Sequence, residues 1–307
     1  MLPSLCQGLT SRNDDPRMIA VLRKLTVLLV SALLLTAASS AKPNLHLIAQ
    51  DNLVAWCIVP FDAKKRGPEE RAAMLNQLGI TKLAYDWREK DIPTFDAEVD
   101  ALRKHKIKLE AFWATVSADP AKNKHLAPIF DVLKRRGEKA QIWLLLAPPP
   151  DFAALGQEEK VKRAAEIILP VVRQAAAVGS KVALYNHGGW FGEPENQIAI
   201  IKTMKQKNVG IVYNFHHGHE HIARFAAMFR TMQPYLLAVN INGMKPEGPK
   251  ILPVGQGTSE SDMLRVVLES GWKGPVGILN HQEDVDAEVG LRRNLEGVAK
   301  FRDQLAR

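Results

Sequence analysis

The chain repeats one pattern eight times, a short apolar run rich in β-forming residues followed by an amphipathic segment, with a period of roughly thirty residues. Most of these runs are almost continuously apolar, which is typical of strands that are buried on both faces, as in a parallel sheet. The predicted strands are 53–59, 82–87, 108–116, 141–147, 181–187, 210–216, 236–242 and 274–280.

The segments between the strands have the spacing and the end signals of helices. The first begins with Pro68 and stops at Gly79, and glycine also follows several of the others. The predicted helices are 68–78, 95–105, 124–136, 158–178, 194–207, 220–232, 259–270 and 287–304. Eight strand–helix units in about 250 residues predict an α/β fold with a single (β/α)8 TIM barrel. A doubly wound open sheet is the alternative, but it usually has fewer strands or a second domain.

The first 41 residues have the three parts of a secretory signal peptide. The basic pair Arg23 and Lys24 precedes an apolar run from Leu25 to Leu35, and small residues follow as far as Ala41. We therefore expect export to the periplasm or the extracellular space, with 1–41 removed, 42–307 forming the barrel domain, and Met18 as an alternative start. An uncleaved membrane anchor is the other interpretation, but the apolar run is shorter than the roughly 20 residues of a membrane-spanning helix. No stable membrane insertion is expected after cleavage.

The charge of the chain argues against nucleic acid as a partner. The formal net charge of +8 falls to +6 without the first 41 residues, which carry four basic and two acidic side chains. The remaining basic residues are not interleaved with aromatic ones, as they are in nucleic-acid-binding proteins. Loss of Cys6 with the signal peptide leaves Cys57 alone, in an apolar run where a buried and unreactive thiol is expected.

In a barrel of this kind, the active site lies at the carboxyl ends of the strands. Polar residues gather at five of the predicted strand ends, whereas the strand beginnings carry mainly lysine, glycine and apolar residues. The polar stretches are 86–89, 185–190, 214–219, 240–243 and 280–284. This asymmetry predicts a ligand cavity at one mouth of the barrel.

The stretch after the fifth predicted strand supplies three candidate residues. His187 is a candidate catalytic residue, and the two glycines after it allow the backbone to approach a ligand closely. Trp190 is a candidate substrate-binding residue, because its apolar face is of the kind on which sugars stack. Glu193 is the candidate catalytic acid of this loop, although a helix N-terminus also favours an acidic residue there.

Four of the nine histidines follow the sixth predicted strand, in the sequence HHGHEH (216–221). His217 is a candidate catalytic residue and His216 a candidate for substrate binding, whereas His219 and His221 fall at the opening of a helix and point in different directions. The zinc motif HEXXH is absent, and we assign no metal ligand in this cluster. His281, after the eighth strand, is a further catalytic candidate.

Amide and charged side chains complete the candidate set. Asn240 and Asn242 point to the same side of the seventh strand, and their amides need partners from either sugar hydroxyls or neighbouring strand ends. Lys245 is a candidate for binding hydroxyl groups, and Asp86 and Arg88 are expected to form a structural ion pair. The motifs GXGXXG, GXXXXGK[ST] and GXSXG are absent, which argues against nucleotide binding and serine-hydrolase chemistry.

At these residues the sequence resembles the xylose isomerase-like TIM barrels, which include sugar phosphate isomerases and epimerases and endonuclease IV-like proteins, and especially their exported planctomycete-type members. The resemblance covers about residues 50–305. It rests on LAYDWRE (83–89), YNHGGWFGEPE (185–195), YNFHHGHEHIARF (213–225), VNINGM (239–244), KILPVGQG (250–257) and GPVGILNHQEDVDAEVGLRRNLEGV (274–298).

The resemblance implies a divalent metal at the barrel mouth, held by Glu, Asp, His and Glu at the ends of strands five to eight. The matching positions here hold Tyr185, Asn214, Asn240 and Asn280, while a sugar-contacting histidine is retained as His217. The resemblance thus implies a sugar-binding barrel in which the metal ligands are substituted. We assign no cofactor, and Asn214 and Asn240 become candidates for substrate binding.

Two functions remain open from the sequence. The first is an enzyme acting on a small saccharide, an isomerase, epimerase or lyase that removes a proton next to a carbonyl group. One of the candidate histidines would be the base, Glu193 its partner, and the asparagines and Lys245 would bind hydroxyls or an enolate. The second is a non-catalytic carbohydrate-binding barrel, because asparagine is a poor base and a good hydroxyl partner. An exported protein meets few sugar phosphates, so a free or oxidised saccharide is the expected ligand.

Overall fold

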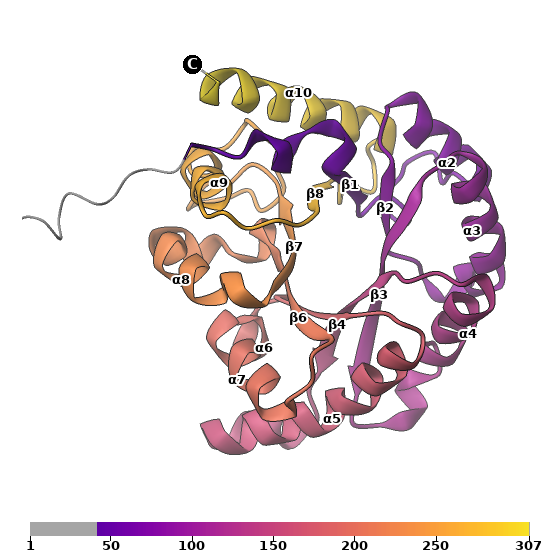
Figure 1. Ribbon diagram of the computed structural model, residues 1–307, viewed down its shortest axis with the longest axis vertical. Coiled ribbons are helices and arrows are strands. Elements are labelled where there is room, and N and C mark those ends of the chain that lie inside the picture. Colours follow the sequence, from indigo (N-terminus) through magenta and orange to yellow (C-terminus); the bar gives the residue numbers. More distant parts are fainter. Residues whose placement is uncertain (1–41, 307) are drawn as a thin grey trace, which may run out of the picture. The chain divides into compact units, whose positions relative to one another are not determined.

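The computed structural model describes residues 42–306, and the predicted signal peptide lies outside the described residues. Eight parallel strands form a closed barrel in sequence order, with β8 pairing to β1 (Figure 1). The strands are β1 (Leu53–Trp56), β2 (Lys82–Tyr85), β3 (Lys108–Ser117), β4 (Gln141–Ala147), β5 (Val182–Tyr185), β6 (Val209–Asn214), β7 (Leu236–Ile241) and β8 (Val276–Leu279). The predicted TIM barrel is confirmed.

Helices follow the strands and form a ring around the barrel (Figure 1). They are α2 (Pro68–Gln77), α3 (Phe95–Lys104), α4 (Leu126–Arg136), α5 (Gln157–Ala177), α6 (Gly189–Gly192), α7 (Pro194–Met204), α8 (Phe225–Met232), α9 (Glu260–Glu269) and α10 (Ala287–Leu305). The predicted helix 220–232 differs most from the structure, because residues His219–Arg224 form a 3-10 turn and α8 begins only at Phe225.

Two apolar cores hold the barrel together. One lies between the strands and the helices, and includes the fully buried side chains of Phe112, Ile129 and Phe229. The other fills the barrel interior, where the rings of Trp56 and Trp143 meet edge to face with centroids 4.8 Å apart. A barrel interior filled in this way is a packed core and not a pore. An aromatic floor therefore lies beneath the mouth.

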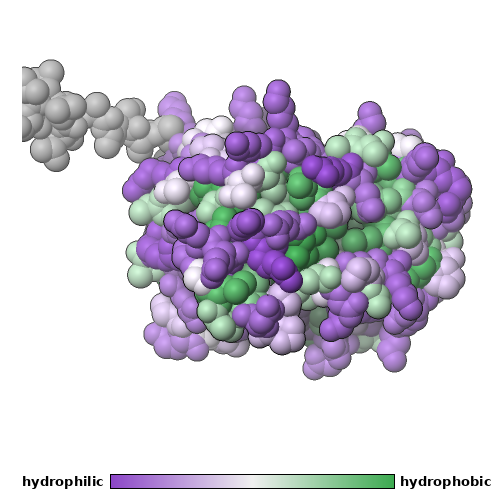
Figure 2. Space-filling view, turned by 90° about the horizontal axis from the view of Figure 1, so that it is seen from below, coloured by the Kyte–Doolittle hydropathy of each residue, from purple (hydrophilic) through white to green (hydrophobic). Residues whose placement is uncertain are grey.

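Hydrophilic side chains cover most of the face seen in Figure 2, with apolar residues in smaller areas between them. Val289 is the only large hydrophobic residue between 42 and 306 that is exposed. Within the same range, no helix combines the length and the apolar character needed to cross a membrane.

Several strands end earlier than their apolar runs predict. The fifth predicted strand, 181–187, stops at Tyr185 in the structure, and the eighth, 274–280, stops at Leu279. The residues beyond these ends lead into the loops around the mouth. His187 and His281 therefore lie on loops that are held by rigid strands, a common position for functional side chains.

Candidate active site at the barrel mouth

A half-open cavity of about 80 Å³ lies at the carboxyl ends of the strands. It is lined by Trp56, Cys57, Phe61, Asp86, Arg88, Trp113, Tyr185, His187, His217 and His281. Since one water molecule takes up about 30 Å³ in the liquid, this space accepts only one end of a small molecule. The remainder of a sugar-sized ligand would lie above it, toward solvent.

Two residues that lie side by side at this mouth have a left-handed backbone conformation. Cys57, just after β1, has φ 55°, and His281, just after β8, has φ 47°. The N–H of His281 donates a hydrogen bond to the carbonyl of Cys57 at 3.2 Å, which extends the pairing of the two strands. Left-handed backbone is uncommon for residues with a side chain and is often found at functional sites. Here it accompanies two side chains that both line the cavity.

Four histidine rings form one cluster at the mouth. The ring centre of His217 lies 4.3 Å from that of His187 and 3.6 Å from that of His216. His281 lies 5.5 Å from His216, ring centre to ring centre, and stacks on Phe61 at 3.9 Å. The structure thus brings together three of the four predicted catalytic residues, together with His216, a predicted substrate-binding residue.

Burial keeps these imidazoles uncharged. It lowers the pKa of His217 to about 3, and the charges of His187 and His281 act in the same direction. Burial also lowers the pKa of His187 and His281, and that of His216 falls well below its usual value. At neutral pH the cluster therefore offers neutral N–H donors and weakly basic ring nitrogens.

Asp86 supplies the one carboxyl group among the side chains that line this cavity. Its Oδ1 accepts a hydrogen bond from the N–H of Val59 at 3.2 Å, whereas its buried Oδ2 has no partner within residues 42–306. Burial raises the pKa of Asp86 to about 6, and the charge of Arg88 opposes this rise. A carboxyl group with such a pKa gains and loses a proton easily near neutral pH.

Arg88 does not pair with the Asp86 carboxylate, so the predicted structural ion pair is wrong. The guanidinium turns back to its own chain and donates hydrogen bonds to the carbonyl oxygens of Asp86, at 2.8 Å, and Trp87, at 3.0 Å. It also lies over the rings of Phe61 and Trp113, with 5.6 Å and 5.7 Å to the ring centroids. These contacts fix the cation inside the mouth without neutralising it.

Three buried amides form a chain beside the cavity. The Oδ1 of Asn186 accepts hydrogen bonds from the backbone N–H and the Nδ2 of Asn214, at 2.7 Å and 3.1 Å. The Nδ2 of Asn240 donates to the Oδ1 of Asn214 at 2.6 Å. The sequence left open whether the Asn240 amide bonds to a sugar hydroxyl or to a neighbouring strand end. In the structure its Nδ2 bonds to Asn214, at the end of the neighbouring strand β6.

Asn242 and Asn280 have structural partners away from this chain. The Nδ2 of Asn242 donates to the carbonyls of Gly243 and Lys250 and so ties down the loop after β7. Asn280 donates to the carbonyl of Phe61, and its Oδ1 occupies the space that a Cβ atom on Gly290 of α10 would need. At the end of β8, the side chain that lines the cavity is therefore His281 and not Asn280.

Trp190 and Glu193 are held outside the cavity. The ring of Trp190 packs edge to face on Phe152 at 5.3 Å, and its N–H donates to Gln157 on α5. Glu193 accepts hydrogen bonds from His221 and Arg224. The structure therefore does not join Glu193 to the histidine cluster as its partner, and the aromatic walls of the mouth are Trp56, Phe61 and Trp113 instead.

Lys250, and not Lys245, is the lysine whose charge acts on the histidine cluster, although it is exposed and lines no part of the cavity. The positive charge of Lys250 acts on His187 and His217 and contributes to their low pKa values, after burial. Lys245 is half-buried, lines no part of the cavity and contributes a carbonyl that accepts from the N–H of Gly248.

Asp86 and Arg88, which were expected to form a structural pair, instead line the cavity. A signal for them exists in β2, because side chains alternate along a strand and Ala84 points into the barrel. Continuing that alternation past the strand end directs residues 86 and 88 inward as well.

The residues at the family metal positions do not fit a hard divalent cation. Tyr185 is buried, which raises the pKa of its hydroxyl well above the usual value, so that it stays neutral. Asn214 and Asn240 bond to each other, and Asn280 faces α10. In the part of the chain that the structure describes, no three His, Cys, Asp or Glu side chains are grouped to hold a metal ion. Manganese and magnesium require charged oxygen donors, which this set lacks.

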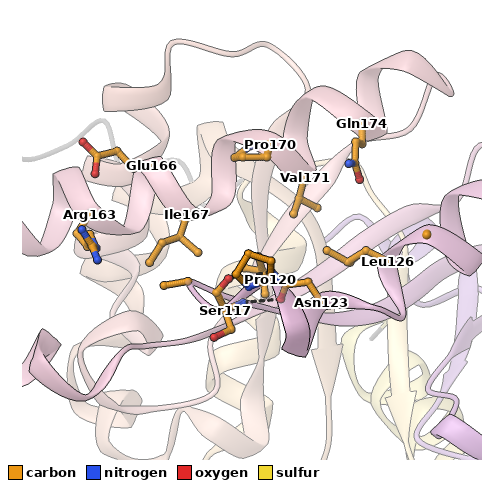
Figure 3. A pocket seen from close by; sticks show the side chains of 13 residues that line it. Ser117, Pro120, Asn123, Leu126, Arg163, Glu166, Ile167, Pro170, Val171 and Gln174 are labelled. Atoms are coloured by element: carbon orange, nitrogen blue, oxygen red, sulfur yellow. Dashed lines mark hydrogen bonds between the residues drawn. The ribbon is translucent and has the colours of Figure 1, made fainter.

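A larger cavity of about 550 Å³ lies outside the barrel, between α5 and the segment that joins β3 to α4. Figure 3 shows Arg163, Glu166 and Gln174 along the α5 edge, with Ile167 and Val171 between them. The three polar side chains are exposed to solvent, and no buried polar atom of the lining lacks a hydrogen-bond partner among the described residues. Titratable side chains with unpartnered buried polar atoms line the smaller cavity and not this groove.

Comparison with known proteins agrees with this architecture. Residues 76–300 match the family model of the xylose isomerase-like TIM barrels. The chain belongs to this family. No curated protein sequence matches the chain significantly.

Solved structures resemble the chain in fold at low sequence identity. A 3-keto-D-glucoside 4-epimerase from E. coli superposes with a TM-score of 0.63 at 14% identity, covering 82% of this chain and 99% of its own. D-Psicose 3-epimerase from Clostridium cellulolyticum gives 0.59 at 15% identity, with 82% and 99% covered. A xylose isomerase domain protein from Planctomyces limnophilus gives 0.62 at 14% identity, with 84% and 99% covered. At such identities the likeness concerns the fold.

Proposed function

We propose that this protein is an enzyme that moves a proton on the carbon next to the carbonyl group of a small saccharide, as an isomerase, epimerase or lyase. One observation carries the proposal: the unpartnered carboxyl oxygen of Asp86 and a cluster of neutral imidazoles line the same small cavity. Asp86 follows β2, whereas the histidines that line the cavity follow β5, β6 and β8, so the two kinds of group reach the cavity from different parts of the ring. Two epimerases acting on sugar compounds among the similar barrels support the substrate class.

Asp86 is the base in this proposal. Its pKa of about 6 leaves the group ionised in most molecules at neutral pH, yet makes it a stronger base than an ordinary aspartate. Its free Oδ2 is the atom that accepts the proton. The sequence favoured a histidine in this role, but a ring whose pKa is about 3, as for His217, is a weak base.

The neutral histidines then act as hydrogen-bond donors. When the C–H bond breaks, its electron pair forms the C=C bond of an enediol or enolate, and negative charge develops on the former carbonyl oxygen. A neutral ring N–H of His217 or His187 stabilises this oxygen by donating a hydrogen bond to it, and the ring keeps its proton. Return of the proton by Asp86 to the neighbouring carbon gives an isomer, and protonation from the opposite face by a second proton donor gives an epimer. Departure of a β-hydroxyl group, which takes up a proton and leaves as water, gives an elimination product.

A non-catalytic carbohydrate-binding barrel is the second candidate. The amide chain through Asn186, Asn214 and Asn240 favours it, because neutral amides stand where the family carries metal-binding groups. In that case Asp86 and the histidines would only bind hydroxyl groups.

Incubation with a panel of aldoses, ketoses and keto-sugars in heavy water separates the two functions. The enzyme incorporates solvent deuterium at the carbon next to the carbonyl, detected by NMR or mass spectrometry. Asp86→Asn keeps the size and the Oδ1 acceptor for Val59 and is expected to abolish exchange. Glu110→Gln is the matched control, because Glu110 is also buried but lies near the start of β3, where it contacts Lys108 and Gln141.

The deuterium-exchange experiment distinguishes the two candidate functions. Exchange that is lost in Asp86→Asn and retained in Glu110→Gln supports the proposal. Binding of a saccharide by calorimetry without exchange or product across the panel supports the second candidate.

A further inference from the structure

Arg88 is built into the mouth as a fixed cation. One guanidinium nitrogen, Nη1, donates to two carbonyl oxygens of its own chain, and Phe61 and Trp113 both lie within 6 Å of the group. An arginine on the surface has no such restraint. The remaining N–H groups of this half-buried side chain have no acceptor within residues 42–306.

No acidic group within residues 42–306 forms an ion pair with Arg88. Within residues 42–306, no carboxylate oxygen lies within 4 Å of its guanidinium, whereas Arg66, Arg71 and Arg224 all have acidic partners. An arginine without a carboxylate partner in a confined cavity presents a planar fork that matches an anion with two oxygens.

The rest of the mouth has the same electrostatic bias. The imidazoles are neutral, Lys250 contributes a second positive charge near His187 and His217, and Asp86 is the one acidic group of the lining. With Asp86 ionised, as the proposed reaction requires, Arg88 and Lys250 still leave an excess of positive charge around the mouth. This charge suits a negatively charged ligand better than a neutral one.

Arg88 and Asp86 lie close enough together for one ligand to reach both, with an anionic group at Arg88 and the carbon that loses a proton at Asp86. The guanidinium turns back until its Nη1 lies 2.8 Å from the carbonyl oxygen of Asp86, so a group bound at Arg88 lies a few bonds away from an atom that faces the Asp86 carboxyl group. The volume of about 80 Å³ also suits one compact end of a ligand better than a whole sugar ring.

From these observations we infer that the ligand is a sugar acid, whose carboxylate is bound by the guanidinium of Arg88 while the neighbouring carbons face Asp86. This inference rests on the proposed function for the role of Asp86, but the binding of the acid by Arg88 can be measured independently. Phe61 and Trp113 then hold the guanidinium plane in position, and Arg88 is the residue that selects the acid.

The test is calorimetric titration with D-glucuronate, D-galacturonate and D-gluconate, each compared with its neutral counterpart D-glucose, D-galactose or D-glucitol. All titrations use the Asp86→Asn protein, so that turnover does not interfere. At least one acid should bind at least tenfold more tightly than its neutral counterpart. Arg88→Gln should remove this preference, and Arg88→Lys should restore part of it, because lysine keeps the charge but not the fork.

Arg163→Gln is the control, since Arg163 is exposed at the outer groove and should leave the preference unchanged. Melting curves of all variants establish that they are folded. The inference is overturned if acids and neutral sugars bind equally, if no acid binds, or if Arg88→Gln keeps the preference. Acid preference without deuterium exchange in the wild-type protein would contradict only the proposed reaction. Exchange on neutral sugars that is unaffected by Arg88→Gln would contradict only the assignment of the sugar acid.

Discussion

The imidazole rings of His187 and His217 lie 4.3 Å apart, centre to centre, although they follow different strands, β5 and β6. At this separation, protonation of one ring disfavours protonation of the other. Together with burial, this keeps both rings neutral, so the mouth has hydrogen-bond donors that do not change their charge over the physiological pH range.

The rate of deuterium exchange should rise with pH and level off above about pH 6. The reason is that Asp86 must be ionised to accept a proton, and burial raises its pKa to about 6. The measurement is the exchange rate under substrate-limiting conditions from pH 4.5 to 8. A profile that is flat through this range would exclude Asp86 as the base.

Asp86→Asn should stabilise the folded protein at neutral pH. Burial raises the folded-state pKa from 3.8 to about 6, so the folded protein binds this proton more tightly than the unfolded chain. The unfolding free energy of the wild-type protein therefore falls between about pH 4 and pH 6, and the ionised group destabilises the fold above that by up to about 3 kcal/mol. Urea unfolding at pH 5 and pH 8 measures it. Equal stability of wild type and variant at both pH values would contradict the raised pKa.

His217→Asn and His187→Asn should reduce saccharide binding or turnover tenfold or more while shifting the melting temperature by only a few degrees. Asparagine keeps a polar side chain of similar size but offers a different N–H geometry. Calorimetry and thermal melts provide the two readouts. A large loss of stability with unchanged ligand binding would return both histidines to a structural role.

The acid side of the stability curve should also change in His217→Asn. The folded-state pKa of His217 is about 3, below that of the unfolded chain, so its contribution to stability is complete above about pH 6.5 and is lost as the pH falls toward 3. The variant lacks this term and should lose less stability than wild type between pH 6.5 and 4. Parallel curves for the two proteins would exclude a depressed pKa at this residue.

Protein purified without a histidine tag should hold no stoichiometric manganese or magnesium at the family position. Asn214 and Asn240 are engaged with each other and carry no charge to hold a hard cation. Elemental analysis after dialysis tests this, with chelator treatment expected to leave the melting temperature unchanged. A near-stoichiometric metal that is lost in Asn214→Ala would revive a metal-dependent reaction.

Export remains a prediction that the N-terminus of the mature protein can test. The basic, apolar and small-residue segments of 1–41 predict cleavage near Ala41. Mass spectrometry of the protein from its native host should find a chain that begins at or near Lys42. A main species that retains Leu25 to Leu35 would indicate an anchor instead.

Much of the fold could be predicted because the strands of a parallel barrel are buried on both faces and leave apolar runs in the sequence. The mouth was harder to predict. Alternation along β8 gives the right directions, with Leu279 in the barrel interior, Asn280 toward α10 and His281 at the cavity, whereas the match to the family metal position gave Asn280 a place at the mouth that it does not have. Similarly, the short helix α6 presents Trp190 to Phe152 and α5, a contact between segments that no local pattern encodes.

The charges of the mouth were missed for a related reason. Residues 86 and 88 have the same strand parity and opposite charge, which favours an ion pair when only the sequence is considered. In the structure Arg88 donates to carbonyl groups of its own loop and packs against Phe61 and Trp113, which come from distant parts of the chain, and Asp86 is left with a free oxygen. Long-range packing decides between these arrangements.

The hydrogen bond between His281 and Cys57 joins the two ends of the barrel domain, at the seam where β8 meets β1. The last strand of the barrel is also the last to leave the ribosome, so the mouth remains incomplete during nearly all of synthesis. A chain that ends before β8 has neither the His281 ring nor the restraint on Cys57. Contacts between such distant parts of a chain form slowly during folding. The proposed activity at this mouth therefore requires the closed barrel, and its appearance during refolding would report the moment of closure.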